Sequence, residues 1–172
     1  PSNITLDNCT AENPYLNGLS IINGYNVKVK GGSYSNSNGT APIAGIDVEG
    51  NVDTAHPGFI NVSIENAEIS NNKGWGILVS QKGTLGNVNI AGNSLSNNLA
   101  GVKHTSIKST ISGNVIDGSV VGIESLRYGG RARDFNQVLN NQVDNCKVGI
   151  RYSGYKGVVK NNVITNSEEA GI

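Results

Sequence analysis

Short stretches in which apolar and polar residues alternate recur along the chain. Copies include VSIEN at 62–66, VNIAGN at 88–93, ISGN at 111–114, VLNN at 138–141 and VKNN at 159–162. Alternation over four or five positions is typical of a half-buried β-strand. A second short stretch follows after an Asn, such as SLS at 94–96 and VIT at 163–165. Each repeat therefore predicts two short strands joined by a tight turn.

A glycine followed by a branched apolar residue recurs seven times, with spacings of 27, 31, 25, 21, 27 and 22 residues. These glycines are Gly18, Gly45, Gly76, Gly101, Gly122, Gly149 and Gly171. A fixed motif with a variable period predicts equal turns of a solenoid that carry loops of different length. We therefore predict one all-β domain over residues 1–172, a right-handed single-stranded parallel β-helix of six to seven coils. Each coil has 21–31 residues and three short strands.

The composition agrees with a fold rich in tight turns. The 172 residues include 26 Asn and 23 Gly, which disfavour helices. Two sets of Asn occupy one turn position in successive coils, and we expect left-handed backbone and stacked side chains at both. The first set is Asn93, Asn114, Asn141 and Asn162, and the second is Asn13, Asn36, Asn71, Asn97, Asn145 and Asn166, interrupted by Gly118. We assign both a structural role.

Charge, cysteine content and the chain ends narrow the class of protein. The 13 basic and 13 acidic residues balance, so nucleic acid is not an expected partner. No apolar run approaches the ~18 residues of a membrane span. Cys9 and Cys146 fall in the first and sixth coils, roughly 24 Å apart, which is too far for a disulfide. Because the chain begins at Pro1 and its last repeat stops at Ile172, we expect a fragment of a longer β-helix.

The repeated order of strand, Asn turn, strand and Gly-Ile resembles the pectate-lyase-like superfamily of right-handed β-helices. The segment AGIDVE at 44–49, a long loop and the strand at 62–64 are most similar to bacteriophage tailspikes and related secreted polysaccharide depolymerases. The resemblance implies an extracellular or virion-associated protein that acts on a bacterial or plant polysaccharide, acidic ones included, and forms a homotrimer. The catalytic motifs of polygalacturonases, pectate lyases and alginate epimerases are absent, so none of their residues can be transferred.

Candidate catalytic residues follow from the period of the strands. If Ile46 and Val48 point inward, Asp47 and Glu49 point outward on one strand, roughly 6–7 Å apart. That separation suits glycoside hydrolysis. His56, in the following loop, is a further candidate acid or base.

Candidate substrate-binding residues lie around a trench on the same face. Long loops at 50–57 and 126–134 leave one edge of the solenoid roughly 14 Å apart, enough for about three sugars. The candidates are Asp53, Trp75, Lys103, Arg127, Tyr128, Arg131 and Arg133. Arginines suit anionic sugars and aromatic rings suit stacking. Two structural alternatives stay open, an ion-pair ladder of Lys103, Glu124 and Arg151 and a corner-filling role for Trp75. His104 is expected inside the core.

The leading hypothesis is an enzyme that binds and cleaves a polysaccharide, as hydrolase or lyase. The alternatives are a non-enzymatic shaft or adhesin segment and a uronate lyase or epimerase that uses Lys103, His56 or an arginine as base. No cofactor is expected. A weaker hypothesis places Ca²⁺ at Asp47, Glu49 and Asp53, whose oxygens are ligands of the type that Ca²⁺ prefers.

Overall fold

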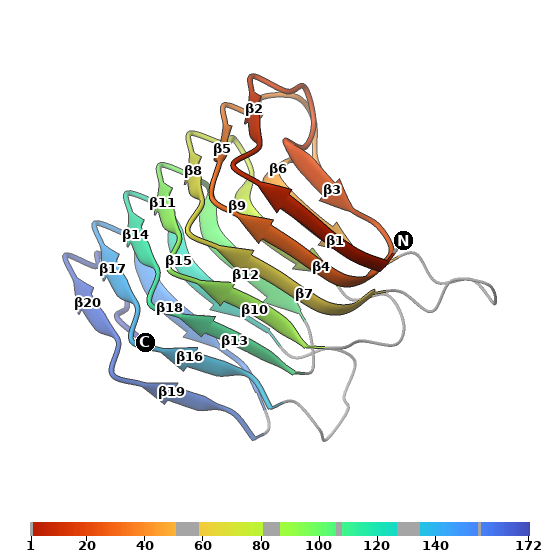
Figure 1. Ribbon diagram of the computed structural model, residues 1–172. Helices are drawn as coiled ribbons and strands as arrows, with labels where there is room; N and C mark the ends of the chain where they lie inside the picture. The colour runs from red at the N-terminus through yellow and green to blue at the C-terminus, as the bar shows by residue number, and fades with distance from the viewer. Residues whose placement is uncertain (1, 51–58, 81–86, 106–107, 127–134, 155) are drawn as a thin grey trace.

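The computed structural model describes residues 2–50, 59–80, 87–105, 108–126, 135–154 and 156–172. These residues form twenty β-strands and no helix. Successive coils stack in one direction from the N-terminus to the C-terminus, and each coil crosses three faces (Figure 1). The predicted all-β parallel β-helix with three strands per coil is confirmed.

The strands form three parallel sheets, named here sheets A, B and C. Sheet A contains β1 (Ser2–Asp7), β4 (Gly24–Lys30), β7 (Phe59–Glu65), β10 (Val88–Ala91), β13 (Ser109–Ser112), β16 (Gln137–Leu139) and β19 (Val158–Lys160). Sheet B contains β2 (Thr10–Glu12), β5 (Ser33–Ser35), β8 (Glu68–Ser70), β11 (Ser94–Ser96), β14 (Val115–Asp117), β17 (Gln142–Asp144) and β20 (Val163–Thr165). Sheet C contains β3 (Leu19–Ile21), β6 (Ala44–Glu49), β9 (Trp75–Ser80), β12 (Ala100–Thr105), β15 (Val121–Ser125) and β18 (Val148–Tyr152).

The core consists of columns in which each coil stacks an apolar side chain on its equivalent in the next coil. On sheet C the column that follows the glycines is Ile46, Ile77, Val102, Ile123 and Ile150, all buried. Glycine is required at these positions because the backbones of successive coils approach each other closely there. A Cβ atom on Gly76 would lie 2.6 Å from the carbonyl oxygen of Gly101, below any normal contact. The Gly-Ile motif therefore marks the corner where successive coils pack backbone against backbone.

The first set of asparagines forms a buried ladder, as predicted. The side chain of Asn114 donates hydrogen bonds to the Ile90 carbonyl (3.0 Å) and to Asn141 Oδ1 (2.9 Å), and its Oδ1 accepts the backbone N–H of Asn93 at 3.0 Å. The amides thus satisfy backbone groups inside the turn, where an unpaired group would be costly. The expected left-handed backbone is wrong for this set. The residue before it takes that conformation instead, as in Asn140 and Asn161 with φ of 56° and 57°.

The second set of asparagines has the left-handed backbone that was predicted. All six residues, and Gly118 at the interruption, have φ between 51° and 64°. Asn and Gly tolerate this region best, which explains why only these two residue types occupy the position. The two cysteines are both unpaired, Cys9 exposed and Cys146 buried, in agreement with the predicted absence of a disulfide between them.

His104 lies in the core column of sheet C between Val79 and Ser125, as expected from its position. It is fully buried, and neither ring nitrogen has a hydrogen-bond partner among the described residues. Burial lowers the pKa of His104 from 6.5 to about 4, because the charged ring would lose its hydration. The folded protein therefore holds this imidazole neutral at physiological pH.

Substitution of an asparagine in the buried ladder tests whether the ladder stabilises the turn. Asn114→Ala removes the acceptor for the Asn93 N–H and the donor to the Ile90 carbonyl, and leaves both groups buried. We expect a loss of about 2–5 kcal/mol in the free energy of unfolding, measured by urea denaturation with circular dichroism. Asn97→Gly is the matched control, since it keeps the left-handed backbone and loses only an exposed 3.3 Å bond to Asn71. Equal losses in the two variants would contradict the assigned role.

The buried histidine predicts an acid-sensitive stability. The unfolded chain binds a proton at His104 near pH 6.5, whereas the folded chain does so only near pH 4. Stability therefore falls as the pH drops through this window, by roughly 3 kcal/mol in full. His104→Val, which copies Val79 in the same column, should remove this part of the loss. Urea midpoints at pH 7 and pH 4.5 measure it, and carboxylate effects common to both proteins cancel. Parallel losses in the two proteins would refute the assignment.

Candidate functional site

Charged side chains form a ladder on the outer face of sheet C. Lys103, Glu124 and Arg151 occupy one register position in β12, β15 and β18. Lys103 Nζ lies 3.3 Å from Glu124 Oε2, and Arg151 Nη1 donates to Glu124 Oε1 at 2.8 Å. The side chain of Glu124 is only 12% exposed, against 30% for Lys103 and 52% for Arg151. The ion-pair ladder that the sequence left open as an alternative is thus present, with its acid enclosed between two cations.

Trp75 extends this ladder toward the N-terminal coils. It is half-buried at the first position of β9, where the neighbouring coils have Ala44 and Ala100. The Lys103 ammonium lies 5.3 Å from the centroid of the indole ring, within the range of a cation–π contact. The structure therefore brings together Trp75 and Lys103, two residues predicted to bind substrate. Lys103 is also a member of the charge ladder.

The two candidate carboxylates on β6 lie in different surroundings. Asp47 and Glu49 both point away from the core column of Ile46 and Val48, as predicted, but Asp47 is only 4% exposed. Its register neighbour Leu78 is also buried. Asp47 is therefore covered although it points outward, whereas Glu49 is partly exposed.

Asn17 holds Asp47 and was not singled out from the sequence. Its Nδ2 donates to Asp47 Oδ2 at 3.1 Å, and its Oδ1 accepts the backbone N–H of Ala44 at 2.9 Å. Asn17 directly precedes Gly18, at the corner position that Trp75 fills in another coil. The signal that could have identified it is a polar residue at a corner position that is apolar in the other coils. Asn17 joins the first coil to the carboxylate of the second.

Several candidates lie outside the described residues. These are Asp53, His56, Arg127, Tyr128, Arg131 and Arg133, and their position relative to Asp47 and Glu49 stays a prediction. The proposed Ca²⁺ site includes one of them, Asp53, and is likewise untested. Within the described part of the chain, no three His, Cys, Asp or Glu side chains come together as metal ligands. None of the described residues forms a helix that is long and apolar enough to cross a membrane.

A third row of asparagines, on the outer edge of sheet A, escaped the sequence analysis. Asn26 donates to Asn3 Oδ1 at 2.9 Å, and Asn61 donates to Asn26 Oδ1 at 2.9 Å. Asn87 continues the row with a 3.3 Å bond to Asn61 Oδ1. The signal was the same as for the other two sets, one residue type at one position of successive coils. Unlike the buried ladder, this row lies at the surface, and we call it the surface amide row.

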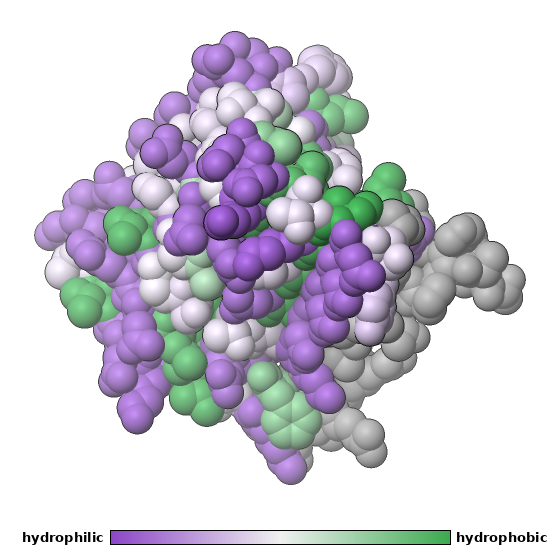
Figure 2. Space-filling view, in the orientation of Figure 1, coloured by the Kyte–Doolittle hydropathy of each residue, from purple (hydrophilic) through white to green (hydrophobic). Residues whose placement is uncertain are grey.

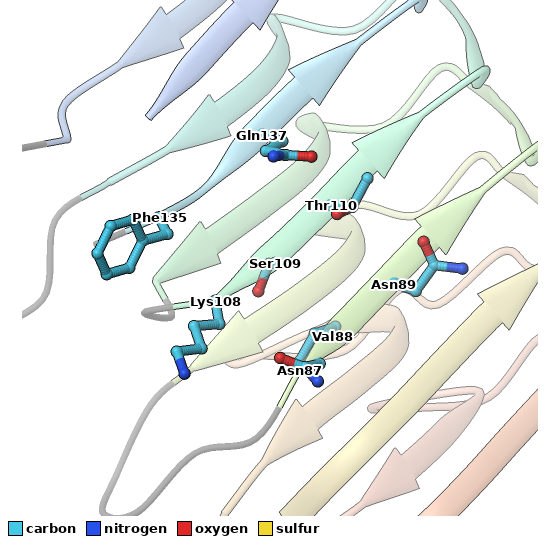
Figure 3. Close-up of a pocket in the computed structure, with 8 residues that line it drawn as sticks. All are labelled: Asn87, Val88, Asn89, Lys108, Ser109, Thr110, Phe135 and Gln137. Carbon is cyan, nitrogen blue, oxygen red and sulfur yellow. The ribbon is translucent and has the colours of Figure 1, made fainter. Parts of the chain in front are cut away.

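The surface amide row borders a groove on sheet A. A second outward column, two residues further along the strands, forms the opposite side: Thr5, Lys28, Ser63, Asn89, Thr110 and Gln137. Two pockets lie between the columns, one of about 330 Å³ over β1, β4 and β7, and one of about 280 Å³ over β10, β13 and β16. The side of the molecule viewed in Figure 1 is mostly hydrophilic (Figure 2). The second pocket is drawn in Figure 3.

Comparison with known proteins identifies the fold family. Residues 44–172 match the family described as right handed beta helix region. The chain belongs to this family. No curated protein and no solved structure matches the chain. Membership of the right-handed β-helix family establishes the solenoid and leaves the activity to be argued from the site.

The charge ladder predicts the effect of neutralising its central acid. Glu124→Gln leaves Lys103 and Arg151 as facing cations with no carboxylate between them. We expect a loss of about 1–2 kcal/mol in the free energy of unfolding, since hydrogen bonds to charged groups are worth more than neutral ones. Glu169→Gln is the control because its ion pair with Lys147 is exposed and should contribute little to stability. Equal effects in urea denaturation would show that the ladder adds no stability.

Proposed function

We propose that this β-helix binds an extended polysaccharide across the outer face of sheet C and cleaves it, in the manner of the tailspikes and secreted depolymerases that its sequence resembles. The observation that carries the proposal is the carboxylate pair of β6, in which Asp47 is shielded and Glu49 is partly open to solvent. Fold alone would not support cleavage, because β-helices also serve as inert spacers.

Glycosidic cleavage uses two carboxyl groups with different tasks. One gives a proton to the leaving oxygen, and the other attacks the sugar or activates water. Carboxyl groups in unlike surroundings are suited to such a division. Asp47, which is shielded from solvent, suits the acid role, and the hydrogen bond from Asn17 fixes its position. Glu49, on the same strand and in contact with solvent, suits the role of nucleophile or base.

The charge ladder favours an acidic polysaccharide. Lys103 and Arg151 contribute two cations, and Glu124 contributes one carboxylate that is largely enclosed. The exposed part of the ladder is therefore positive, which suits a uronate carboxylate. The Trp75 ring beside Lys103 offers an apolar surface for a sugar ring. An extracellular or virion-associated location and a homotrimer belong to the same proposal, as does participation of His56 and the loop arginines.

A non-enzymatic shaft or adhesin segment is the second candidate. It is favoured by the fact that the groups expected to carry chemistry already contact one another. Lys103 and Arg151 bind Glu124, and Asp47 accepts a hydrogen bond from Asn17. The same contacts argue against Lys103 as the base of a uronate lyase or epimerase, since its ammonium is held by a carboxylate.

Incubation with acidic and neutral bacterial and plant polysaccharides tests the proposal. Chain length, reducing ends and ultraviolet absorbance are followed together, because only a lyase creates an unsaturated, absorbing product. We expect one acidic polymer to be shortened with new reducing ends. Asp47→Asn and Glu49→Gln should each lower the rate by about 10²-fold or more, the scale of acid–base catalysis.

The control for these variants is Glu68→Gln, an exposed acid on β8 of sheet B, which should cleave at the wild-type rate. Full activity of both Asp47→Asn and Glu49→Gln would refute the catalytic pair. Absence of shortening for every polymer would favour the shaft or adhesin function instead.

A further inference from the structure

We propose that the outer face of sheet A carries a second glycan-binding groove, which holds an acidic polysaccharide along the solenoid axis. The inference shares the ligand class of the proposed function but not its site or its residues. The groove runs between the surface amide row and the parallel column on the same strands. The two pockets described above lie in it one after the other, the first over β1, β4 and β7 and the second over β10, β13 and β16.

The first column of the groove continues beyond the asparagines. After Asn87, its next positions are Lys108 and Phe135, which line the second pocket with it. Figure 3 shows Asn87, Lys108 and Phe135 at the beginnings of three successive strands. The floor between the columns is closed by buried residues such as Val88. The groove is therefore a shallow channel with side chains on both sides and backbone below.

The surface amide row has hydrogen-bonding positions left over for the hydroxyl groups of a sugar. Within the row, Asn26 and Asn61 each use one donor and one acceptor position, and the two end members use one position each. An Asn side chain has two N–H groups and an oxygen with two lone pairs. The remaining positions are available to a ligand. Because the amides already hold one another in place, less rotamer freedom is lost when a ligand binds.

The opposite column supplies the same chemistry in a second line. Asn89, Thr110 and Gln137 are exposed or partly exposed and line the second pocket. A ligand between the columns therefore meets donors and acceptors on both sides, coil after coil. The coil spacing, about 4.8 Å, is similar to the length of one sugar unit in an extended chain. A repeating, hydroxyl-rich polymer matches this pattern better than a compact ligand.

Phe135 and Lys108 define the sugar class at the second pocket. Phe135 is 46% exposed at the rim, where an aromatic face suits the apolar side of a sugar ring. None of the ion pairs between described residues involves the exposed Lys108. No acidic residue lines either pocket. A uronate carboxylate is therefore the expected partner of Lys108.

At the other pocket the lysine of the groove is already paired with an acid, so the uronate assignment rests on Lys108. Lys28 lies 3.0 Å from Glu65, just beside the groove. Hydrogen bonds from Ser63 and then Lys28 hold the pKa of Glu65 below its ordinary value, so this acid stays ionised and engaged with the lysine. Two lysines in the groove are too few for the multiple phosphate contacts of nucleic acid binding, and the polar lining lacks the apolar centre of a stable protein interface.

Defined oligosaccharides test the groove separately from the proposed active site. The probes are hexamers of galacturonate and mannuronate, with cellohexaose as the neutral comparison, and Glu49→Gln is the background so that cleavage does not consume them. Calorimetry reports all binding, whereas the fluorescence of Trp75, the single tryptophan, reports on sheet C. We expect a uronate hexamer to bind with heat, and the part of this heat that belongs to sheet A to be lost on substitution in the groove while any change in Trp75 fluorescence, which belongs to sheet C, stays the same.

Two substitutions should weaken this binding. Phe135→Ala is expected to lower the affinity for the uronate hexamer about tenfold, and Lys108→Gln about fivefold. The matched controls are Val163→Ala, an exposed apolar residue of sheet B, and Lys73→Gln, an exposed lysine away from sheet A. Both should bind like the Glu49→Gln background.

Four outcomes would overturn the inference. The first is that no uronate hexamer binds at millimolar concentration, and the second is that Phe135→Ala and Lys108→Gln both bind normally. The third is equal affinity for cellohexaose, which removes the acidic assignment. The fourth is a trimer in sedimentation that Phe135→Ala dissociates, since sheet A would then be a subunit interface. Binding that changes Trp75 fluorescence and ignores both substitutions would support sheet C alone.

Discussion

The parallel backbone hydrogen bonds between successive coils are the constraint on which the rest of this structure depends. Each strand must meet its equivalent at the same height and in the same register, so every coil has to reproduce one cross-section. Corners are the difficult points, because backbone groups turn inward there with no strand to bond. The buried asparagines satisfy those groups, as Asn114 does for Asn93 and Ile90. The glycines let the other corner close without a side chain.

Because the interior is fixed in this way, variation is left to the outward columns and the corner positions. One corner position is Asn17 in the first coil, Ala44 in the second and Trp75 in the third. Asn17 reaches the carboxylate of Asp47, and Trp75 meets the Lys103 ammonium. Residues that break the repeat at a permissive position are therefore the ones that add chemistry to a scaffold that otherwise repeats.

The repetition of one cross-section also explains which features of the structure could be predicted from the sequence. Register follows from the repeat, so the ladder of Lys103, Glu124 and Arg151 and the inward position of His104 were predictable from counting residues. Exposure does not follow from register. Asp47 points away from the core and is still covered, because its surroundings depend on Asn17 from a coil 30 residues away. The surface amide row was visible in the sequence, but nothing in the pattern separated it from the other two asparagine sets, and Asn3, Asn26 and Asn61 share the left-handed backbone of the second set.

The two outer faces differ in how often their chemistry is repeated. Asp47 and Glu49 occur in one coil only, which defines a single position on the solenoid. The groove of sheet A presents similar amides and hydroxyls in coil after coil, so a polymer lying along it finds equivalent contacts after sliding by one unit. Repeated contacts raise the effective concentration of a long chain without fixing its register. A face that retains a polymer and a face that acts at one point are complementary features for a protein that meets its ligand as a long chain.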